Sequence, residues 1–253
     1  MKAILNPIQF FSKNYLDGNA TLPKLTDVNF DVLFDFNTKN TQLTAQSTAL
    51  DFIMTLNDVY NDFPNREIDR IVLANTNIKD AVFTYFDAMD AEHPLCTLAN
   101  NEKKDVVLEF PQVNTNKIRV NITSTNSDGI QIGQMRICKY ILDLKGTSET
   151  TLKPIVSDGT IRTYNGNLIS WLDYEKWGAT ITIQNALLEQ INLIREYLDK
   201  DEFIIVRPFP VFSDADIYEC RVPRPGIGGF NVNRWSGRLD LSIDLEGRDN
   251  ARY

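Results

Sequence analysis

His93 is the first residue to consider for chemistry, because it is the only histidine in the chain. It lies among acids in the run Asp90-Ala-Glu-His-Pro94. Neighbouring carboxylates raise the pKa of an imidazole, which can then act as a general base. The alternative is an exposed loop histidine before a proline. No nucleophile motif accompanies it, so we expect the loop histidine and a protein that is not an enzyme.

Two further motifs hold residue types that bind ions. Gly226-Ile-Gly-Gly229 could hold a phosphate, but strand-like residues follow it, whereas an anion site needs a helix N-terminus. Ser213-Asp-Ala-Asp216 offers two carboxylates, too few for an EF-hand type calcium site. With one histidine and no closely spaced cysteine pair, a zinc site lacks ligands. We therefore predict no metal and no cofactor, an interface loop at 226–229 and a solvated turn at 213–216.

Four aromatic residues could form a platform on which a sugar ring stacks: Trp171, Tyr174, Trp177 and Trp235. The alternative is that they pack in a core or an interface, where aromatic side chains supply much of the buried area. The three cysteines, Cys96, Cys138 and Cys220, are far apart and odd in number. We expect them to be buried or half-buried free thiols.

The composition excludes several classes of protein. The 253 residues are 43% hydrophobic and 24% charged, which is typical of globular chains. A net charge of -8 argues against a nucleic-acid partner, which needs clustered Lys and Arg. No run of about 18 apolar residues indicates a membrane span. The first 15 residues are too broken for a signal peptide, so we expect synthesis in a cytoplasm.

The stretch from Lys117 to Ile141 predicts a β-hairpin at the centre of the first half. Ile118, Val120 and Ile122 alternate with polar residues, as in a strand that buries one face. A turn at 125–129 follows, and in the next strand the alternation slips by one residue at Gly133. Such a slip is typical of a β-bulge.

Further short strands are expected at intervals of about ten residues, as in a β-sandwich or barrel. They cover 32–36, 71–73, 81–86 and 105–110, with a polar loop at 37–48. The residues 49–60 fit a helix or a strand equally well.

These strands resemble a discoidin, or galactose-binding-like, jelly roll over about residues 25–143. The similar runs are Asp69-Arg-Ile-Val-Leu-Ala-Asn-Thr-Asn-Ile78, Val82-Phe-Thr-Tyr-Phe86, Asn116-Lys-Ile-Arg-Val-Asn-Ile122 and Ile130-Gln-Ile-Gly-Gln-Met-Arg-Ile137. Within this span the chain lacks the family's Trp-Ser segment and disulfide pair, so no sugar-binding residue is transferred. The resemblance leaves a structural calcium site in this half open. Sandwiches that begin with an N-terminal segment of this kind resemble virion proteins of tailed bacteriophages.

The second half follows a linker expected at 144–157. A strand is predicted at 180–183, then a helix with Asn185 as N-cap and an apolar face, then strands at 203–206 and 217–222. The helix face contains Leu187, Leu188, Ile191, Ile194 and Leu198. Strict alternation from Trp235 to Leu245 predicts a long, half-buried strand. This order of strands around a single helix resembles the tail-tube-like domains of phage tail and baseplate proteins. The run that ends the last of these strands is Arg234-Trp-Ser-Gly-Arg-Leu-Asp-Leu-Ser-Ile-Asp-Leu-Glu-Gly247.

Together these patterns predict a mainly β chain, with a discoidin-like β-sandwich followed by a smaller β-sandwich domain with one packed helix. The expected parts are an arm at 1–24, the sandwich at 25–143, the linker, and a tail-tube-like domain at 158–253. The function expected from the two resemblances is structural: a homo-oligomeric ring in the distal tail or baseplate of a phage-like virion, with other tail proteins as partners.

Subunits of such a ring would join through sheet edges and loops. The candidate interface residues are Phe10, Phe11, Tyr15, Arg221, Arg224, Ile227 and Phe230. The alternative function is a carbohydrate-binding adhesion module for host-surface glycans. A hydrolase with scattered carboxylates is a third class that the sequence leaves open.

Overall fold

The structure is a computed structural model. It describes residues 8–12, 14–16, 43–45, 47–56, 66–144, 149–152, 155–162, 168–198, 204–207, 218–221, 231–232 and 239–250. The described chain is mainly β, with a single helix, which confirms the predicted fold class. It forms two compact units. We call the described residues from 11 to 141 the sandwich unit, and those at 8–10 and from 142 onward the sheet unit.

The sandwich unit contains eight strands in two antiparallel four-stranded sheets. One sheet has the order β2-β9-β4-β7 and the other β3-β8-β5-β6. The bounds are β2 Leu43–Ala45, β3 Leu50–Thr55, β4 Arg66–Thr76, β5 Ile78–Phe86, β6 Glu92–Leu98, β7 Val106–Thr115, β8 Lys117–Thr125 and β9 Ile130–Cys138. Every connection except β5–β6 passes from one sheet to the other. This order is that of a jelly roll, so the predicted discoidin-like β-sandwich is confirmed.

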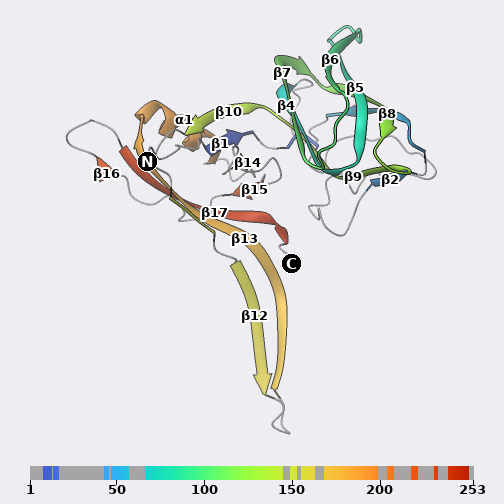
Figure 1. The fold of residues 1–253 in the computed structure, drawn as a ribbon. Helices are drawn as coiled ribbons and strands as arrows, with labels where there is room; N and C mark the ends of the chain where they lie inside the picture. Colours follow the sequence, from blue (N-terminus) through green and yellow to red (C-terminus); the bar gives the residue numbers. More distant parts are fainter. Residues whose placement is uncertain are drawn as a thin grey trace, which may run out of the picture. The chain divides into compact units, whose positions relative to one another are not determined.

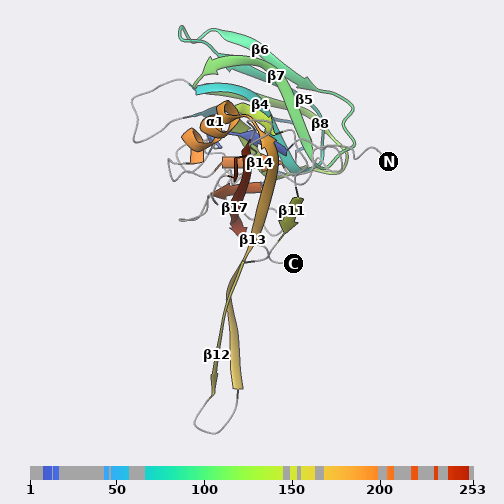
Figure 2. The ribbon, with the colours of Figure 1, turned by 90° about the vertical axis from the view of Figure 1, so that its left-hand side faces the viewer.

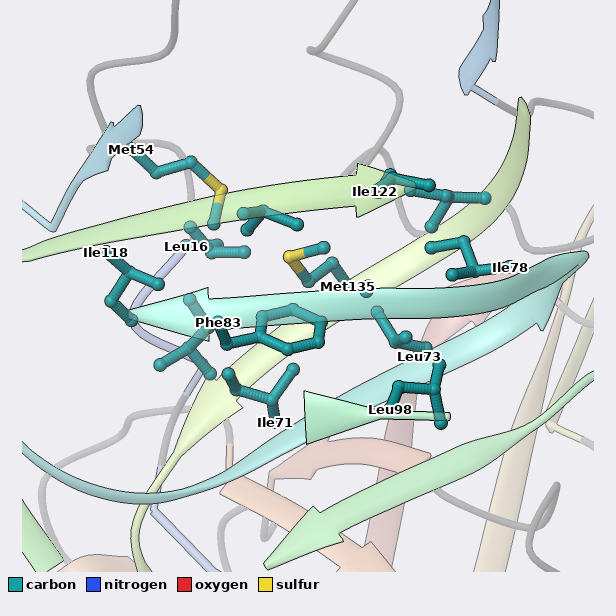
Figure 3. Packing of buried hydrophobic residues seen from close by; sticks show 14 of the residues in the cluster. Leu16, Met54, Ile71, Leu73, Ile78, Phe83, Leu98, Ile118, Ile122 and Met135 are labelled. Carbon is teal, nitrogen blue, oxygen red and sulfur yellow. The ribbon is translucent and has the colours of Figure 1, made fainter. Parts of the chain in front are cut away.

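The core of the sandwich unit lies between the two sheets (Figure 3). As the alternation predicts, Ile118, Val120 and Ile122 of β8 are all fully buried. Figure 3 shows Phe83 of β5 among the labelled aliphatic side chains, with Met135 of β9 beside it. Strand β8 therefore buries one row of side chains, and its alternate row is left on the outer face.

The two predicted strands are confirmed as β8 and β9, but they do not form the predicted β-hairpin. β8 pairs with β3 and β5 in one sheet, whereas β9 pairs with β2 and β4 in the other, because the turn between them carries the chain across the sandwich. The predicted one-residue bulge in β9 is also wrong. Ile132 and Met135 both lie in the core, so the alternation does slip near Gly133. The register between β9 and β4 nevertheless stays unbroken, from Ala74 paired with Gln134 to Thr76 paired with Ile132. Asn75 of β4 has a φ of 50° at the same level. In both β4 and β9 the row of core-facing side chains therefore shifts by one residue at the same level. Neither strand has an extra residue, as a β-bulge would require.

Part of the predicted N-terminal arm pairs with β9. The Tyr15 amide donates to the Ile137 carbonyl at 2.9 Å, and the Ser12 amide donates to the Lys139 carbonyl at 2.8 Å. The Asn14 side chain accepts a hydrogen bond from the Ile137 amide at 3.0 Å. Leu16 is then fully buried in the core. These residues therefore pair with the part of the β9 edge that the short strand β2 does not reach.

The sheet unit is built on one nine-stranded sheet with the order β10-β1-β14-β15-β17-β13-β11, to which β12 is added through β13 and β16 through β17. The bounds are β1 Ile8–Phe11, β10 Tyr140–Leu144, β11 Glu149–Leu152, β12 Ile155–Arg162, β13 Leu168–Ala186, β14 Ile204–Arg207, β15 Tyr218–Arg221, β16 Asn231–Val232 and β17 Leu239–Asn250. The long alternating strand is confirmed as β17, in which Ile243 and Leu245 are buried and Asp244 is exposed.

A long hairpin of β12 and the first half of β13 leaves this sheet. In Figures 1 and 2 it extends away from the other strands of its unit. Among the described residues, 168–175 of β13 pair with β12 alone, whereas β17 and β11 pair with β13 from Lys176 onward. The strands β11 and β12 cover much of the stretch 144–157, where we expected a linker. Thr and Val in this stretch favour strands even without clear alternation.

The single helix, α1 Leu188–Leu198, confirms the predicted helix but corrects its start. Asn185 lies inside β13, so it is not the N-cap. Instead the Leu187 amide donates to Gln190 Oε1 at 3.1 Å, as in a capping box. Leu187 and Leu188 are exposed and Ile191 is buried, so the first two leucines do not belong to the buried face.

Other predictions fall partly outside the described residues. The residues 49–60, which fitted helix or strand, form β3 over Leu50–Thr55. The predicted strand at 32–36 lies outside the described part of the chain, and of the polar loop at 37–48 residues 43–45 form β2. The three cysteines are free thiols, with Cys96 half-buried and Cys138 and Cys220 buried, as predicted.

Candidate functional site

The outer face of the sheet β3-β8-β5-β6 has a group of polar side chains around one arginine. Arg119 points outward because its neighbours Ile118 and Val120 point into the core. Side chains from the three other strands of the sheet surround it. We call these four residues the Arg119 cluster: Asp51 of β3, Thr84 of β5, Glu92 of β6 and Arg119 of β8.

The hydrogen bonds of the Arg119 cluster fix the orientation of its planar groups. Arg119 donates from Nε to Asp51 Oδ1 at 2.7 Å and from the Nη2 nitrogen to Asp51 Oδ2 at 2.5 Å. Its Nη1 nitrogen donates to Glu92 Oε2 at 3.1 Å, and Thr84 donates to Glu92 Oε1 at 2.6 Å. Two carboxylates therefore hold one guanidinium from both sides.

The cluster is open to solvent. The side chains of Arg119, Asp51 and Glu92 are 36%, 43% and 36% exposed. The bonds from Arg119 lower the pKa of Asp51 below its ordinary value. The bonds from Asp51, with the charge of Glu92, raise the pKa of Arg119. Asp51 and Arg119 therefore stay charged at neutral pH.

Two exposed aliphatic side chains border the cluster on the same face. Ile53 lies directly opposite Arg119 in the register of β3 and β8, and Val82 lies opposite Asn121 in that of β5 and β8. They are 42% and 40% exposed. The face thus combines fixed polar groups with small apolar surfaces.

The turn between β5 and β6 is organised by Asp87. Its carboxylate accepts hydrogen bonds from the amides of Met89 and Ala91, and from His93 Nε2 at 2.8 Å. The bond from His93 and those from the two amides lower the pKa of Asp87. The His93 ring also stacks on Tyr85, with ring centroids 5.3 Å apart.

His93 therefore has a structural role that the sequence did not predict. It lies in strand β6 and not in a loop, and its ring holds Asp87 instead of facing a nucleophile. Among the residues described, no three His, Cys, Asp or Glu side chains gather to hold a metal ion. Within the described part of the chain, no helix is long and apolar enough to cross a membrane.

The predicted interface residues are placed as follows. Phe10 and Phe11 are buried, at 1% exposure each. Tyr15 is half-buried, and the Arg66 guanidinium lies 5.7 Å from its ring centroid. Arg221 forms an ion pair with Glu246 at 3.2 Å. Arg224, Ile227 and Phe230 lie outside the described residues, so the interface itself stays a prediction.

Several motifs considered from the sequence also lie outside the described part. They are Ser213–Asp216, Gly226–Gly229, Trp235 and the side chains of Trp171, Tyr174 and Trp177. The Arg119 cluster was missed by sequence reasoning. The only signal for it was the polar row on β8 that alternates with Ile118, Val120 and Ile122.

No protein-family model and no curated protein matches this chain. Similar solved structures cover about half of it. The family 32 carbohydrate-binding module from Streptococcus pneumoniae EndoD is 14% identical over 50% of this chain and 99% of that module, with a TM-score of 0.42. The family 32 module from C. perfringens NanJ, in complex with galactose, is 12% identical over 52% of this chain and 99% of its own, with a TM-score of 0.41.

A third similar structure is chitosan-binding module 2 from a chitosanase/glucanase of Paenibacillus sp. IK-5, in complex with chitotriose. It is 12% identical over 49% of this chain and 98% of its own, with a TM-score of 0.40. At these sequence identities and TM-scores, the ligands of these modules do not indicate what this chain binds.

Proposed function

We propose that the sandwich unit is a glycan-binding module and that the Arg119 cluster is its ligand-contacting surface. The observation that carries this proposal is the fixed, solvent-open arrangement of Arg119 between Asp51 and Glu92. Jelly rolls are a common architecture of lectin domains, so the fold is compatible with this role.

The chemistry of the cluster suits sugar hydroxyl groups. A hydroxyl both donates and accepts, so it can bond to a carboxylate oxygen and to a neighbouring guanidinium N–H at once. Because Asp51, Glu92 and Arg119 already hold one another, little side-chain freedom is lost on binding. The exposed Ile53 and Val82 can contact the apolar C–H faces of a sugar ring.

A glycan array with the purified full chain tests this proposal. We expect Arg119→Ala to weaken binding to any glycan found by roughly tenfold or more, because charge-assisted hydrogen bonds are lost. Arg221→Ala is a matched control, since Arg221 is similarly exposed at 42% and paired with a carboxylate in the sheet unit. Its binding should equal that of the wild type. An absence of binding to every glycan, or equal binding by both variants, would overturn the proposal.

We also propose a second role, in which the sheet unit assembles copies of the chain into a ring of a phage-like tail in the virion. The observation in its favour is the hairpin of β12 and β13. Among the described residues, β12 pairs with β13 alone, and residues 168–175 of β13 pair with β12 alone. A two-stranded ribbon is marginal alone, and its open edges favour pairing with another subunit.

Solution mass and negative-stain images test the assembly role. A closed ring for the wild type supports it. A smaller particle is then expected when residues 158–172 are replaced by a Gly-Ser turn. A wild-type monomer at high concentration, with no tail protein as partner, would contradict it.

A further inference from the structure

We infer that Asp51 and Glu92 are specificity-determining residues that make the Arg119 cluster bind uncharged sugars and reject anionic ones. This inference rests on the proposed glycan-binding function. Its structural basis is that both cations of the outward row on β8, Arg119 and Lys117, are already paired with carboxylates.

The first cation is Arg119. All three of its nitrogen atoms donate to carboxylates: Nε and one terminal nitrogen to Asp51, and the other terminal nitrogen to Glu92. An anionic sugar binds an arginine best through two parallel N–H donors. In Arg119 the fork formed by Nε and its neighbouring nitrogen is already filled by Asp51.

The second cation is Lys117, at the end of the same outward row on β8. Its ammonium group lies 2.6 Å from Asp90 Oδ1 and 5.1 Å from the centroid of the Phe86 ring. The Lys117 charge is therefore also paired, and the Phe86 ring lies against it.

The balance of charge around these two cations is negative. Three carboxylates, those of Asp51, Glu92 and Asp90, lie against the two cations Arg119 and Lys117. The carboxylate of Asp87 adds a further negative charge at the adjoining turn, where its partner is the ring of His93. A sialic or uronic acid would bring one more anion close to these groups, and like charges a few ångströms apart repel even in water.

The experiment compares pairs of oligosaccharides that differ by one acid group, such as lactose and sialyllactose, or a hexose oligomer and its C6-oxidised uronic acid form. We expect the wild type to bind the anionic member at least about fivefold more weakly, the size of one unscreened like-charge contact. High salt should reduce this difference, because it screens exposed charges.

The double variant Asp51→Asn with Glu92→Gln keeps the shape of both side chains and releases the Arg119 fork. We expect it to reverse the preference, so that the anionic member binds more tightly. The matched control is Asp244→Asn with Glu109→Gln, which removes two exposed carboxylates outside this face and should keep the wild-type preference. If the double variant does not fold, the single variant Asp51→Asn is used.

The outcomes separate the two claims. Wild-type protein that binds no member of any pair overturns the proposed function. Wild-type protein that binds both members equally overturns this inference and leaves the proposed function standing. A folded double variant that does not gain affinity for the anionic member overturns the inference as well.

Discussion

Arg119 and Asp51 are joined by two hydrogen bonds although they are not directly opposite each other in the sheet. The residue opposite Arg119 on β3 is Ile53, and Asp51 is one outward position further along. The guanidinium reaches diagonally to Asp51, at 2.7 and 2.5 Å, and on the other side to Glu92. One side chain of β8 thus connects β3 with β6 across the face of the sheet.

Substitution of Arg119 should affect glycan binding much more than the stability of the fold. Exposed ion pairs add little to folding, so we expect Arg119→Ala to shift the melting temperature by no more than a few degrees. Glycan binding should fall sharply. Thermal unfolding and binding measured on the same preparation check this split, and a large loss of stability would show that the cluster is chiefly structural.

Phe83 and Val82 are neighbours on β5 that face opposite sides of the sheet. Phe83 is fully buried, whereas Val82 is 40% exposed. We expect Phe83→Ala to lower the free energy of unfolding by about 3–5 kcal/mol, because it leaves a cavity in the core. Val82→Ala, the control, should change it by less than about 0.5 kcal/mol. Urea denaturation measures both, and equal effects would contradict the assigned faces.

Asn14 should matter more than its position in a polar N-terminal segment suggests. Its side chain is 4% exposed and accepts hydrogen bonds from the amides of Ile137 and Leu16. Asn14→Ala leaves these buried donors without that partner, so we expect a loss of about 1–3 kcal/mol in unfolding free energy. Ser47→Ala removes a comparable local bond at an exposed site and should have little effect. If both variants unfold at the same urea concentration, the Asn14 hydrogen bonds do not stabilise the fold as described.

Asp87 should stabilise the β5–β6 turn above acidic pH only. Its pKa in the folded chain is lowered, chiefly by the bond from His93 and then by the amides of Ala91 and Met89. A lowered pKa gives stability that is present above the unfolded pKa, near 4, and is lost as the pH falls through the folded value. We expect Asp87→Asn to melt earlier than the wild type at pH 7, and the difference to vanish in strong acid. A constant difference at every pH would disprove this linkage.

The sequence predicted the elements with regular alternation better than their contacts. Ile118, Val120 and Ile122 mark β8 because one face of that strand is uniformly buried. The helix start was misplaced because Leu187 and Leu188 continue an apolar pattern although tertiary packing leaves them exposed. The spacing of apolar residues along the sequence does not show which of them pack against another element of the fold.

The Arg119 cluster could not be predicted for a related reason. Asp51 is 68 residues and Glu92 is 27 residues away from Arg119 in the chain. Only the strand order β3-β8-β5-β6 brings them together, and that order follows from crossovers that no local pattern encodes. The slip at Gly133 shows the same limit, because the compensating change lies in Asn75 on another strand.

The strands β1 and β10 are neighbours in the nine-stranded sheet, although the sandwich unit lies between them in the sequence. The whole jelly roll is therefore inserted between two neighbouring strands of one sheet. Insertions at such points are well tolerated when both ends of the guest lie close together. The two junctions thus fall on neighbouring strands, so replacing the sandwich unit by another domain would leave the strand order of the sheet unit unchanged.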